Sequence, residues 1–384
     1  MTTDLLALDP ELTVEDRLIR DTVRRFADDH LRPHIADWFE AGVLPRDLAG
    51  EFGKLGLLGM HLTGYGCAGS TAVQYGLVCT ELEAVDSGIR SLVSVQGSLA
   101  MYAIWRYGSA EQKQQWLPRL AGGDAIGCFG LTEPDSGSDP GGMRTHAHRD
   151  GPDWVLDGTK MWITNGGWAD VAVVWARTDD GVRGFLVPRD TPGFTTQEVG
   201  RKLSLRASVT SELTFTGCRL PADAQLPGAT SLGAPLSCLT EARFGILWGV
   251  LGAARECFQT AVDYAGTRVQ FDRPISAFQL TQEKLVDMAV ELNKGLLLAL
   301  HLGRLKDAGA LTPAQVSFGK LNNVREALTI ARQARTILGA NGITLDYPVL
   351  RHMNNLESVL TYEGTSEVHT LVLGEQITGI PAFR

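Results

Sequence analysis

The sequence predicts an α+β protein in which a helical region, a β region and a second helical region follow one another. Apolar residues recur at helical spacing in the first third of the chain, short alternating runs follow Cys128, and long apolar helical patterns return after Ser231. We therefore expect an N-terminal helical domain at residues 1–127, a central β domain at residues 128–230 and a four-helix bundle domain at residues 231–384. No linker separates them, so an active site is expected where they meet.

The first helical region begins with a helix that Thr13 can cap. Glu15 and Asp16 suit the positive end of this helix, and its apolar face runs to Leu31, before Pro33. Further helices are predicted at residues 74–85, 92–107 and 110–120, and the glycine-rich segment 58–70 is expected to be irregular.

The β region is predicted to contain two hairpins and a further strand. Residues 154–156 and 159–164 form the first hairpin, because Asp157-Gly158 between them is a preferred pair for a two-residue turn. Residues 171–176 and 183–187 form the second hairpin, and the alternating run 211–215 predicts another strand.

The second helical region contains long helices at residues 246–264, 279–302 and 313–338. Their apolar positions are dense and only partly one-sided. Helices of this kind pack against several neighbours, so we expect a bundle that also makes subunit contacts.

The composition argues against nucleic acid as a main partner. The 384-residue chain is 44% hydrophobic and carries a formal net charge of -9, without a basic stripe to neutralise phosphates. No targeting pattern or apolar run long enough for a membrane span is visible. The six cysteines form no C-x-x-C pair and favour buried thiols in a reducing compartment. We therefore predict a cytoplasmic protein. We predict no metal-ligating residues.

The strongest candidate for a catalytic group is Glu363, in the stretch Thr361 to Glu367. This stretch follows a helical pattern at residues 350–360, Gly364 suits the end of that helix, and Ser366 with Glu367 suits the first turn of the next. A carboxylate at such a junction can project into a cleft, so we interpret Glu363 as a general base. A solvated glutamate is the alternative that the stretch alone favours.

Two segments of the β region could bind a planar ligand. Residues 129–139 are rich in glycine and hydroxyl side chains, which offer hydrogen bonds to a polar ligand edge. Trp162 beside Thr164 could stack on a heterocycle and hydrogen-bond to it. The alternatives are an ordinary surface loop and a core aromatic.

Two segments of the second helical region could bind a nucleotide. Arg268, Gln270 and Phe271, with Gln279 further on, suit a pyrophosphate and an adenine, although a helix-end arginine with a core phenylalanine explains the spacing as well. The glycines of residues 338–342 either cap a helix or let a ligand approach the backbone.

Arg90 has two interpretations. It lies near Glu81 and Glu83 in the sequence and just before an apolar helical pattern. It is either one partner of a surface salt bridge, which contributes little, or a cation inside a pocket that meets a substrate carboxylate.

Together and in this order, these motifs resemble the acyl-CoA dehydrogenase family over essentially the whole chain. The motifs are Leu131-Thr132-Glu133-Pro134 with Gly137-Ser138-Asp139, Trp162-Ile163-Thr164-Asn165, Arg268-x-Gln270-Phe271, Leu338-Gly339-x-Asn341-Gly342 and Tyr362-Glu363-Gly364-Thr365. Residues 85–91, 128–134, 203–208, 248–253 and 377–380 are most similar to the glutaryl-CoA-specific members. Ile89, Thr240-Glu241, Gly166-Gly167-Trp168 and Ser366-Glu367 differ from the residues usual in those members, which leaves another short-chain or dicarboxylyl-CoA open as substrate.

The resemblance implies the acyl-CoA dehydrogenase fold, a homotetramer, FAD as cofactor, an acyl-CoA substrate and an electron-transferring flavoprotein as partner. Glu363 would remove the proton next to the thioester, and a hydride would pass from the next carbon to FAD. Glutaryl-CoA would then lose CO2 to give crotonyl-CoA.

The resemblance also implies two sets of binding residues. The FAD set is Phe129, Gly130, Leu131, Thr132, Glu133, Pro134, Gly137, Ser138, Trp162, Ile163, Thr164, Arg268, Phe271, Gln279, Thr365, Ser366, Glu367 and Phe383, with Thr336, Ile337, Leu338, Gly339 and Ala340 from a neighbouring subunit. The substrate set is Glu83, Arg90, Ser91, Ser138, Leu236, Ser237, Cys238, Leu239, Thr240, Glu241, Ala242, Arg243, Tyr362 and Gly364.

Overall fold

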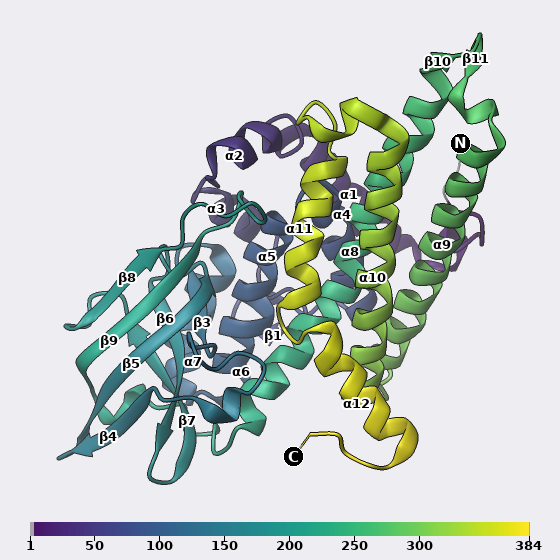
Figure 1. Cartoon of the computed structure of the whole chain (residues 1–384). Coiled ribbons are helices and arrows are strands. Elements are labelled where there is room, and N and C mark those ends of the chain that lie inside the picture. Colours follow the sequence, from purple (N-terminus) through teal and green to yellow (C-terminus); the bar gives the residue numbers. More distant parts are fainter. Residues whose placement is uncertain (1–3, 384) are drawn as a thin grey trace.

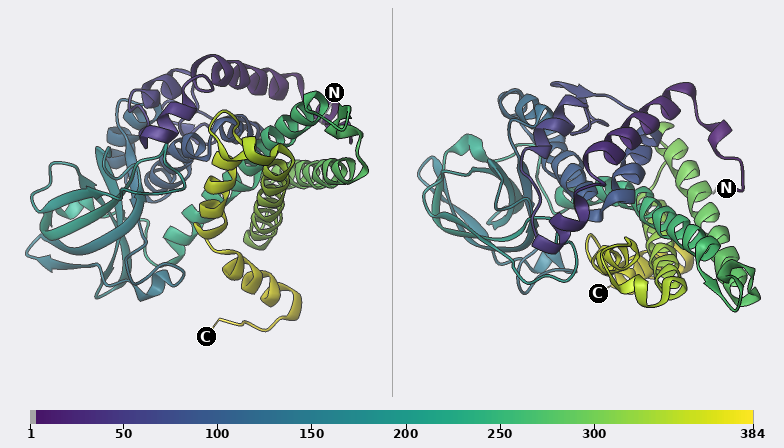
Figure 2. Two further views of the ribbon diagram at one scale, coloured as in Figure 1. Left: turned by 45° about the horizontal axis from the view of Figure 1, so that its top comes forward. Right: turned by 90° about the horizontal axis from the view of Figure 1, so that it is seen from above.

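A computed structural model describes residues 4–383 and places a β-sheet beside two groups of helices (Figure 1). The views in Figure 2 show the sheet on one side of the molecule and the C-terminal helices on the other. The α+β class predicted from the sequence is confirmed. The extents of the three predicted domains remain a prediction.

The N-terminal helices largely follow the sequence predictions. They are α1 (Val14–His30), α2 (Ile35–Ala41), α3 (Leu48–Lys54), α4 (Ala72–Val85), α5 (Ser87–Ser94), α6 (Tyr102–Tyr107) and α7 (Ala110–Gly122). Thr13 caps α1 as predicted, in a reciprocal pair of hydrogen bonds with Asp16. The helix expected at 92–107 begins earlier, at Ser87, because the Asp86 side chain accepts a hydrogen bond from Gly88. It continues through a π-helical turn at Val95–Met101 into α6.

The segment 58–70 is irregular as predicted, apart from the two-residue strands β1 (Thr63–Gly64) and β2 (Cys67–Ala68). The seven strands of the main sheet are β3 (Gly127–Gly130), β4 (His146–Asp150), β5 (Asp153–Thr164), β6 (Val171–Thr178), β7 (Gly181–Pro188), β8 (Phe194–Glu198) and β9 (Thr210–Leu220). Their order is β3-β6-β4-β5-β9-β8, with β7 paired to β6.

One predicted hairpin is correct and the other is wrong. Strands β6 and β7 form the second hairpin, closed by the pair Thr178 and Gly181. Residues 154–164 instead form one continuous strand, β5, in which Asp157-Gly158 makes a bulge and not a turn. A Cβ atom on Gly158 would lie 2.4 Å from the Thr145 hydroxyl oxygen, so glycine permits the close approach of β4 at this bulge. Turns and bulges select the same residues, and the sequence alone does not separate them.

The C-terminal region contains long helices and one small hairpin. The helices are α8 (Gly233–Thr267), α9 (Gln279–Asp307), α10 (Pro313–Leu338), α11 (Val349–Thr361) and α12 (Ser366–Thr378), and the hairpin consists of β10 (Val269–Gln270) and β11 (Arg273–Pro274). Helix α11 lies on the side of this group that is nearer to the sheet (Figures 1 and 2). No helix within residues 4–383 is both long and apolar enough to cross a membrane.

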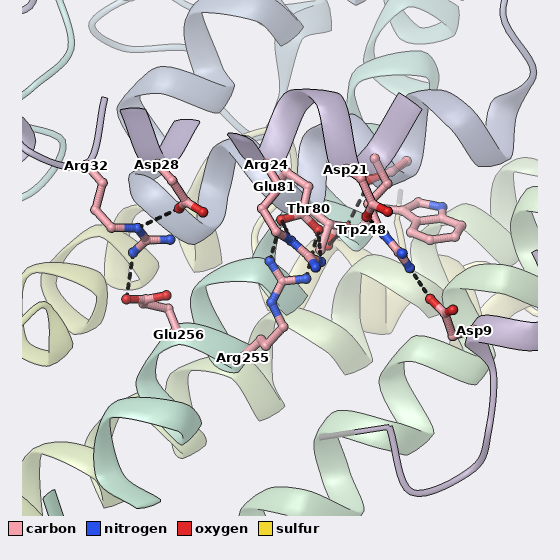
Figure 3. Close-up of polar contacts among 12 residues, drawn as sticks. Asp9, Asp21, Arg24, Asp28, Arg32, Thr80, Glu81, Trp248, Arg255 and Glu256 are labelled. Atoms are coloured by element: carbon pink, nitrogen blue, oxygen red, sulfur yellow. Dashed lines mark hydrogen bonds and ion pairs between the residues drawn. The ribbon is translucent and has the colours of Figure 1, made fainter. Parts of the chain in front are cut away.

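A buried carboxylate joins α1, α4 and α8 (Figure 3). Arg24 and Arg255 each donate two hydrogen bonds to Glu81, with donor–acceptor distances of 2.7–3.0 Å. Burial acts to raise the pKa of Glu81, but the two guanidinium groups outweigh it and lower the pKa to about 2. This cluster therefore joins the three helices, and the two guanidinium groups compensate the negative charge of the buried Glu81 carboxylate.

Candidate active site

The predicted catalytic stretch forms the tight connection between α11 and α12. The Thr365 side chain caps α12 by accepting a hydrogen bond of 3.2 Å from the Val368 amide. Glu363 has a φ of 52° and Gly364 a φ of 94°, so both residues have left-handed backbone conformations. A non-glycine residue in this region is strained, and such strain persists only where the surroundings hold it.

Two cations from other helices hold this connection in place. Lys320 on α10 donates hydrogen bonds to the backbone oxygens of Tyr362 (2.5 Å) and Gly364 (2.6 Å). Arg243 on α8 donates one to the backbone oxygen of Glu363 (2.7 Å). Three consecutive carbonyl groups are thus bound. Arg243 was predicted in the substrate set, whereas Lys320 was not predicted, because the sequence shows only a lysine within a long helical pattern.

The electrostatic setting suits Glu363 to act as a base. Its Oε2 atom is buried and has no hydrogen-bond partner within residues 4–383. Burial raises the pKa of Glu363, against the opposing effect of Arg90, Lys320 and Arg243. Burial lowers the pKa of the Lys320 ammonium, and the two neighbouring arginines lower it further. The carboxylate is therefore close to positive charge but is not neutralised by direct contact.

Arg90 on α5 is a buried cation, so its interpretation as part of a surface salt bridge is wrong. Its side chain is 1% exposed, its Nε donates to Glu83 (2.7 Å), and its Nη2 donates to the Tyr362 hydroxyl. Ser87 donates a further hydrogen bond to Glu83. A Cβ atom on Gly249 would lie 2.2 Å from the Glu83 carboxylate, so this glycine makes room for the pair. The structure thus brings three predicted substrate residues together next to Glu363, and Ser91, also buried, lies beside Tyr362.

The loop after β3 is shaped from within by Glu133. The Glu133 carboxylate accepts hydrogen bonds from the backbone N–H groups of Arg144 (2.6 Å) and Thr145 (2.9 Å) and from the Lys160 ammonium (2.8 Å). Its backbone N–H and oxygen both bond to Ser136. The Glu133 carboxylate thus supports the loop from within, and the place of Glu133 in the FAD set stays a prediction.

Other residues of the predicted FAD set divide between core and surface. Trp162 is 58% exposed at a φ of 65°, so its ring is available to a ligand. Ile163 (3% exposed) and Leu338 (1% exposed) point into the core and can contribute only through their backbone. The buried Phe129, Gly130 and Leu131 lead into the loop. The exposed members of the set are Pro134, Gly137, Ser138, Arg268, Gln279, Thr336, Gly339, Ala340, Glu367 and Phe383. Partly exposed are Thr132, Thr164, Thr365 and Ser366.

A hollow of about 330 Å³ lies beside the β10–β11 hairpin, where the nucleotide was expected. It is lined by Gln270, Phe271, Ile275, Phe278, Thr281, Lys284, Thr336 and Ile337. Two of the predicted segments, around Phe271 and around Thr336, are therefore adjacent within one chain, whereas we had assigned the second to a neighbouring subunit. Phe271 is 88% exposed at the tip of the hairpin.

The predicted substrate channel along the first turns of α8 is only partly open. Cys238 and Ala242 are fully buried and belong to the hydrophobic core, and their place in the substrate set stays a prediction. Glu241 pairs with Lys306 at 2.8 Å, and Ser237 bonds to the Tyr107 hydroxyl at 2.6 Å. Leu236 is exposed, and Leu239 and Thr240 are partly exposed.

The fold and this site define a flavin-dependent acyl-CoA dehydrogenase. Models of the N-terminal, middle and C-terminal domains of acyl-CoA dehydrogenases match residues 13–124, 128–218 and 232–378. The chain belongs to the acyl-CoA dehydrogenase family, which is FAD-dependent. The residues present fit this cofactor: the exposed Trp162 ring offers a stacking surface, and the hollow beside Phe271 has room for a nucleotide.

Solved structures and curated relatives resemble the chain over nearly its full length. A glutaryl-CoA dehydrogenase from Mycobacterium smegmatis is 70% identical, with a TM-score of 0.98 over 99% of both chains. A glutaryl-CoA dehydrogenase from the same organism in complex with FADH2 is 66% identical, with a TM-score of 0.98 over 99% of this chain and 98% of that one. The human mitochondrial short-chain specific acyl-CoA dehydrogenase is 37% identical over 94% of this chain and 90% of its own.

Proposed function

We propose that this acyl-CoA dehydrogenase oxidises and decarboxylates glutaryl-CoA to crotonyl-CoA and CO2. The observation that carries the proposal is a buried guanidinium, that of Arg90, which donates to Tyr362 and lies near Glu363, whose buried Oε2 atom has no hydrogen-bond partner within residues 4–383. A cation at this depth suits a substrate whose acyl chain ends in a carboxylate. The two similar glutaryl-CoA dehydrogenases support the same substrate.

Glu363 removes the proton from the carbon next to the thioester. Its raised pKa strengthens it as a base, and its fixed backbone holds the carboxylate in one position. The Gly364 N–H donates no hydrogen bond within residues 4–383, so it is free to stabilise the negative charge that develops on the thioester oxygen. When bound, FAD supplies the acceptor for the hydride lost from the next carbon.

Arg90 positions the distal carboxylate of the substrate and so determines which acyl chains bind well. Its Nε and Nη2 are taken by Glu83 and Tyr362, which leaves Nη1 without a hydrogen bond among residues 4–383. After oxidation, the bond between the γ-carbon and the carboxylate breaks, and its electron pair moves towards the thioester. Glu363, protonated in the first step, can return that proton to the γ-carbon.

A second candidate is dehydrogenation of another short-chain or dicarboxylyl-CoA without decarboxylation. Glu83 already compensates the charge of Arg90, and a pair of this kind can be purely structural. The similar human protein is named a short-chain specific acyl-CoA dehydrogenase.

We further propose a homotetramer that passes electrons to an electron-transferring flavoprotein. Support for assembly comes from exposed apolar side chains on α9 and α10, namely Val286, Val290, Leu297 and Phe318, each 46–59% exposed. The six cysteines are free thiols, five of them buried, which supports a reducing, cytoplasmic environment.

The test mixes the FAD-loaded protein anaerobically with glutaryl-CoA that carries ¹³C in its distal carboxylate, and separately with butyryl-CoA. We expect glutaryl-CoA to bleach the flavin faster, and labelled CO2 and crotonyl-CoA to form with an electron acceptor. Glutaconyl-CoA without labelled CO2 would establish the second candidate, and preference for butyryl-CoA would contradict the role of Arg90.

A double variant tests Arg90 without leaving a buried charge unpaired. In Glu83→Gln with Arg90→Gln, both members of the pair are neutral. We expect kcat/KM to fall roughly 100-fold for glutaryl-CoA, as for truncation of a buried charged contact, and far less for butyryl-CoA. Equal losses with the two substrates would show that the pair is structural.

A further inference from the structure

Two histidines and an aspartate lie together on the outward face of strands β4 and β5. His146 and His148 are two residues apart on β4, so their side chains leave the same face of the sheet. Their rings are stacked with centroids 6.2 Å apart. Asp157 on β5 is the direct partner of His146 in the strand register. The nearest ligand atoms of all three lie within 4.8 Å of one another.

We propose that His146, His148 and Asp157 bind a divalent first-row transition metal ion, with Zn2+ as the representative ion. Two imidazole nitrogens and one carboxylate oxygen suit Zn2+, and water completes a four-coordinate site. Ligand atoms in such a site are separated by about 3.3 Å, given metal–ligand bonds of about 2.0–2.1 Å. The exposed histidine rings can close this difference by small rotations about their side-chain bonds.

The carboxylate is already oriented for this task. The bulge at Asp157-Gly158 places Asp157 opposite His146, and the Gly217 N–H donates a 2.7 Å hydrogen bond to Oδ1 of Asp157. The second carboxylate oxygen remains for the metal. A fixed hydrogen bond behind a metal ligand of this kind restricts its rotation and strengthens binding.

The neighbouring cations are occupied elsewhere, so they do not neutralise this carboxylate. Arg219 on β9 is bound to Asp150 and Asp153 at the far end of the β4–β5 pair. Arg177, the neighbour of His146 on β6, donates to the backbone oxygens of Gly141 and Met143. Harder ions such as Mg2+ prefer sites made of oxygen alone and are excluded by the two imidazoles.

The ion would join β4 to β5 next to the network that shapes the predicted flavin loop. His146 follows Thr145, whose backbone N–H binds Glu133, and Asp157 precedes Gly158, which packs against Thr145. The proposed role is therefore to stabilise this part of the sheet. The ion has no part in the chemistry at Glu363.

The test titrates chelator-treated, FAD-loaded protein with Zn2+ in a calorimeter. We expect one ion per chain, retained in excess Mg2+, and weaker binding in acid because protonated imidazole cannot bind a metal. Zn2+ should also raise the unfolding temperature, by an amount that grows with the logarithm of the ratio of free Zn2+ concentration to Kd. Binding of less than one ion per chain would overturn the proposal.

Variants identify the ligands. His146→Ala, His148→Ala and Asp157→Asn should each weaken Zn2+ binding at least about tenfold, and Asp157→Asn keeps the oxygen that accepts from Gly217. His301→Ala is the matched control, because His301 is an exposed histidine on α9. An affinity that is unchanged in the β4 variants, or reduced equally by His301→Ala, would show that Zn2+ binds elsewhere on the surface.

Discussion

Glu81 is buried, Glu363 has one buried carboxylate oxygen, and both lie close to several cations, yet their pKa values shift in opposite directions. Glu81 receives four hydrogen bonds from Arg24 and Arg255, and its pKa falls to about 2. The cations around Glu363 donate to backbone oxygens or to other side chains, and its pKa rises. Direct hydrogen bonds separate a structural carboxylate from a reactive one, whereas proximity of positive charge does not.

Three cations surround Glu363 without binding its carboxylate directly. Lys320 and Arg243 use their hydrogen bonds to fix the strained backbone at Glu363 and Gly364, and Arg90 is already paired with Glu83. None of them donates to the carboxylate that carries out the chemistry. The positive charge remains available to the negative charge that develops on the substrate.

The largest expected effect is that of Glu363→Gln on catalysis. The amide cannot accept the proton, so flavin reduction by an acyl-CoA should slow by roughly 10²–10⁴-fold, the usual contribution of a general base. FAD should stay bound, which its absorption spectrum shows. Stopped-flow bleaching measures the rate, and a rate near that of the wild type would remove Glu363 from its role.

The corresponding change at Glu81 should act on stability. Glu81→Gln removes the carboxylate that pairs with the Arg255 guanidinium. We expect the free energy of unfolding to fall by about 3 kcal/mol. The pKa of Glu81 is lower in the folded state than in the unfolded state. The carboxylate therefore stabilises the fold fully when the pH is above the unfolded-state pKa, and this stabilisation is lost as the pH falls through the folded-state pKa of about 2. The wild type and the Glu81→Gln variant should therefore differ less in their free energy of unfolding as the pH becomes acidic.

A matched control for Glu81 is available on α8. Glu256→Gln breaks an ion pair with Arg32 whose side chains are 38% and 23% exposed, and it should cost at most about 1 kcal/mol. Denaturant unfolding measures both variants. If Glu81→Gln and Glu256→Gln lowered the free energy of unfolding equally, burial of the Glu81 cluster would add nothing to stability.

The next effect is that of Lys320→Met, which frees the backbone that positions the base and also removes one of the cations that lower the pKa of Glu363. Loss of two backbone hydrogen bonds frees the connection that carries Glu363, and kcat should fall on the order of 10- to 100-fold while KM changes little. Lys294→Met, at an exposed lysine on α9, is the control. If Lys320→Met raised KM and left kcat intact, the lysine would be acting on substrate binding.

The contrast between the two carboxylates also shows what could be predicted from the sequence. Glu363 was predicted as the base because its signals, Gly364 and the pair Ser366 and Glu367, lie beside it in the chain. Lys320 lies 43 positions away, and the sequence gives no measure of its burial or of the carbonyls that it meets. The inward hydrogen bonds of the Glu133 carboxylate and the burial of Cys238 and Ala242 were not predicted, because a motif identifies a segment and does not specify which way each side chain points. The fold class was predictable, since it depends on periodicity over many residues.

The smallest expected effect is that of Glu363→Gln on stability, and its sign is opposite to that at Glu81. A carboxyl group with a raised folded pKa binds its proton more tightly in the folded state, so its charged form destabilises the fold as the pH rises through that pKa. Gln resembles the protonated form. The variant should therefore unfold at the same or a higher temperature than the wild type near pH 7, with the difference vanishing below the unfolded pKa. Calorimetry at several pH values measures this. A clearly lower unfolding temperature at pH 7 would mean that Glu363, like Glu81, is stabilised by its cations, and the distinction between the two sites would not hold.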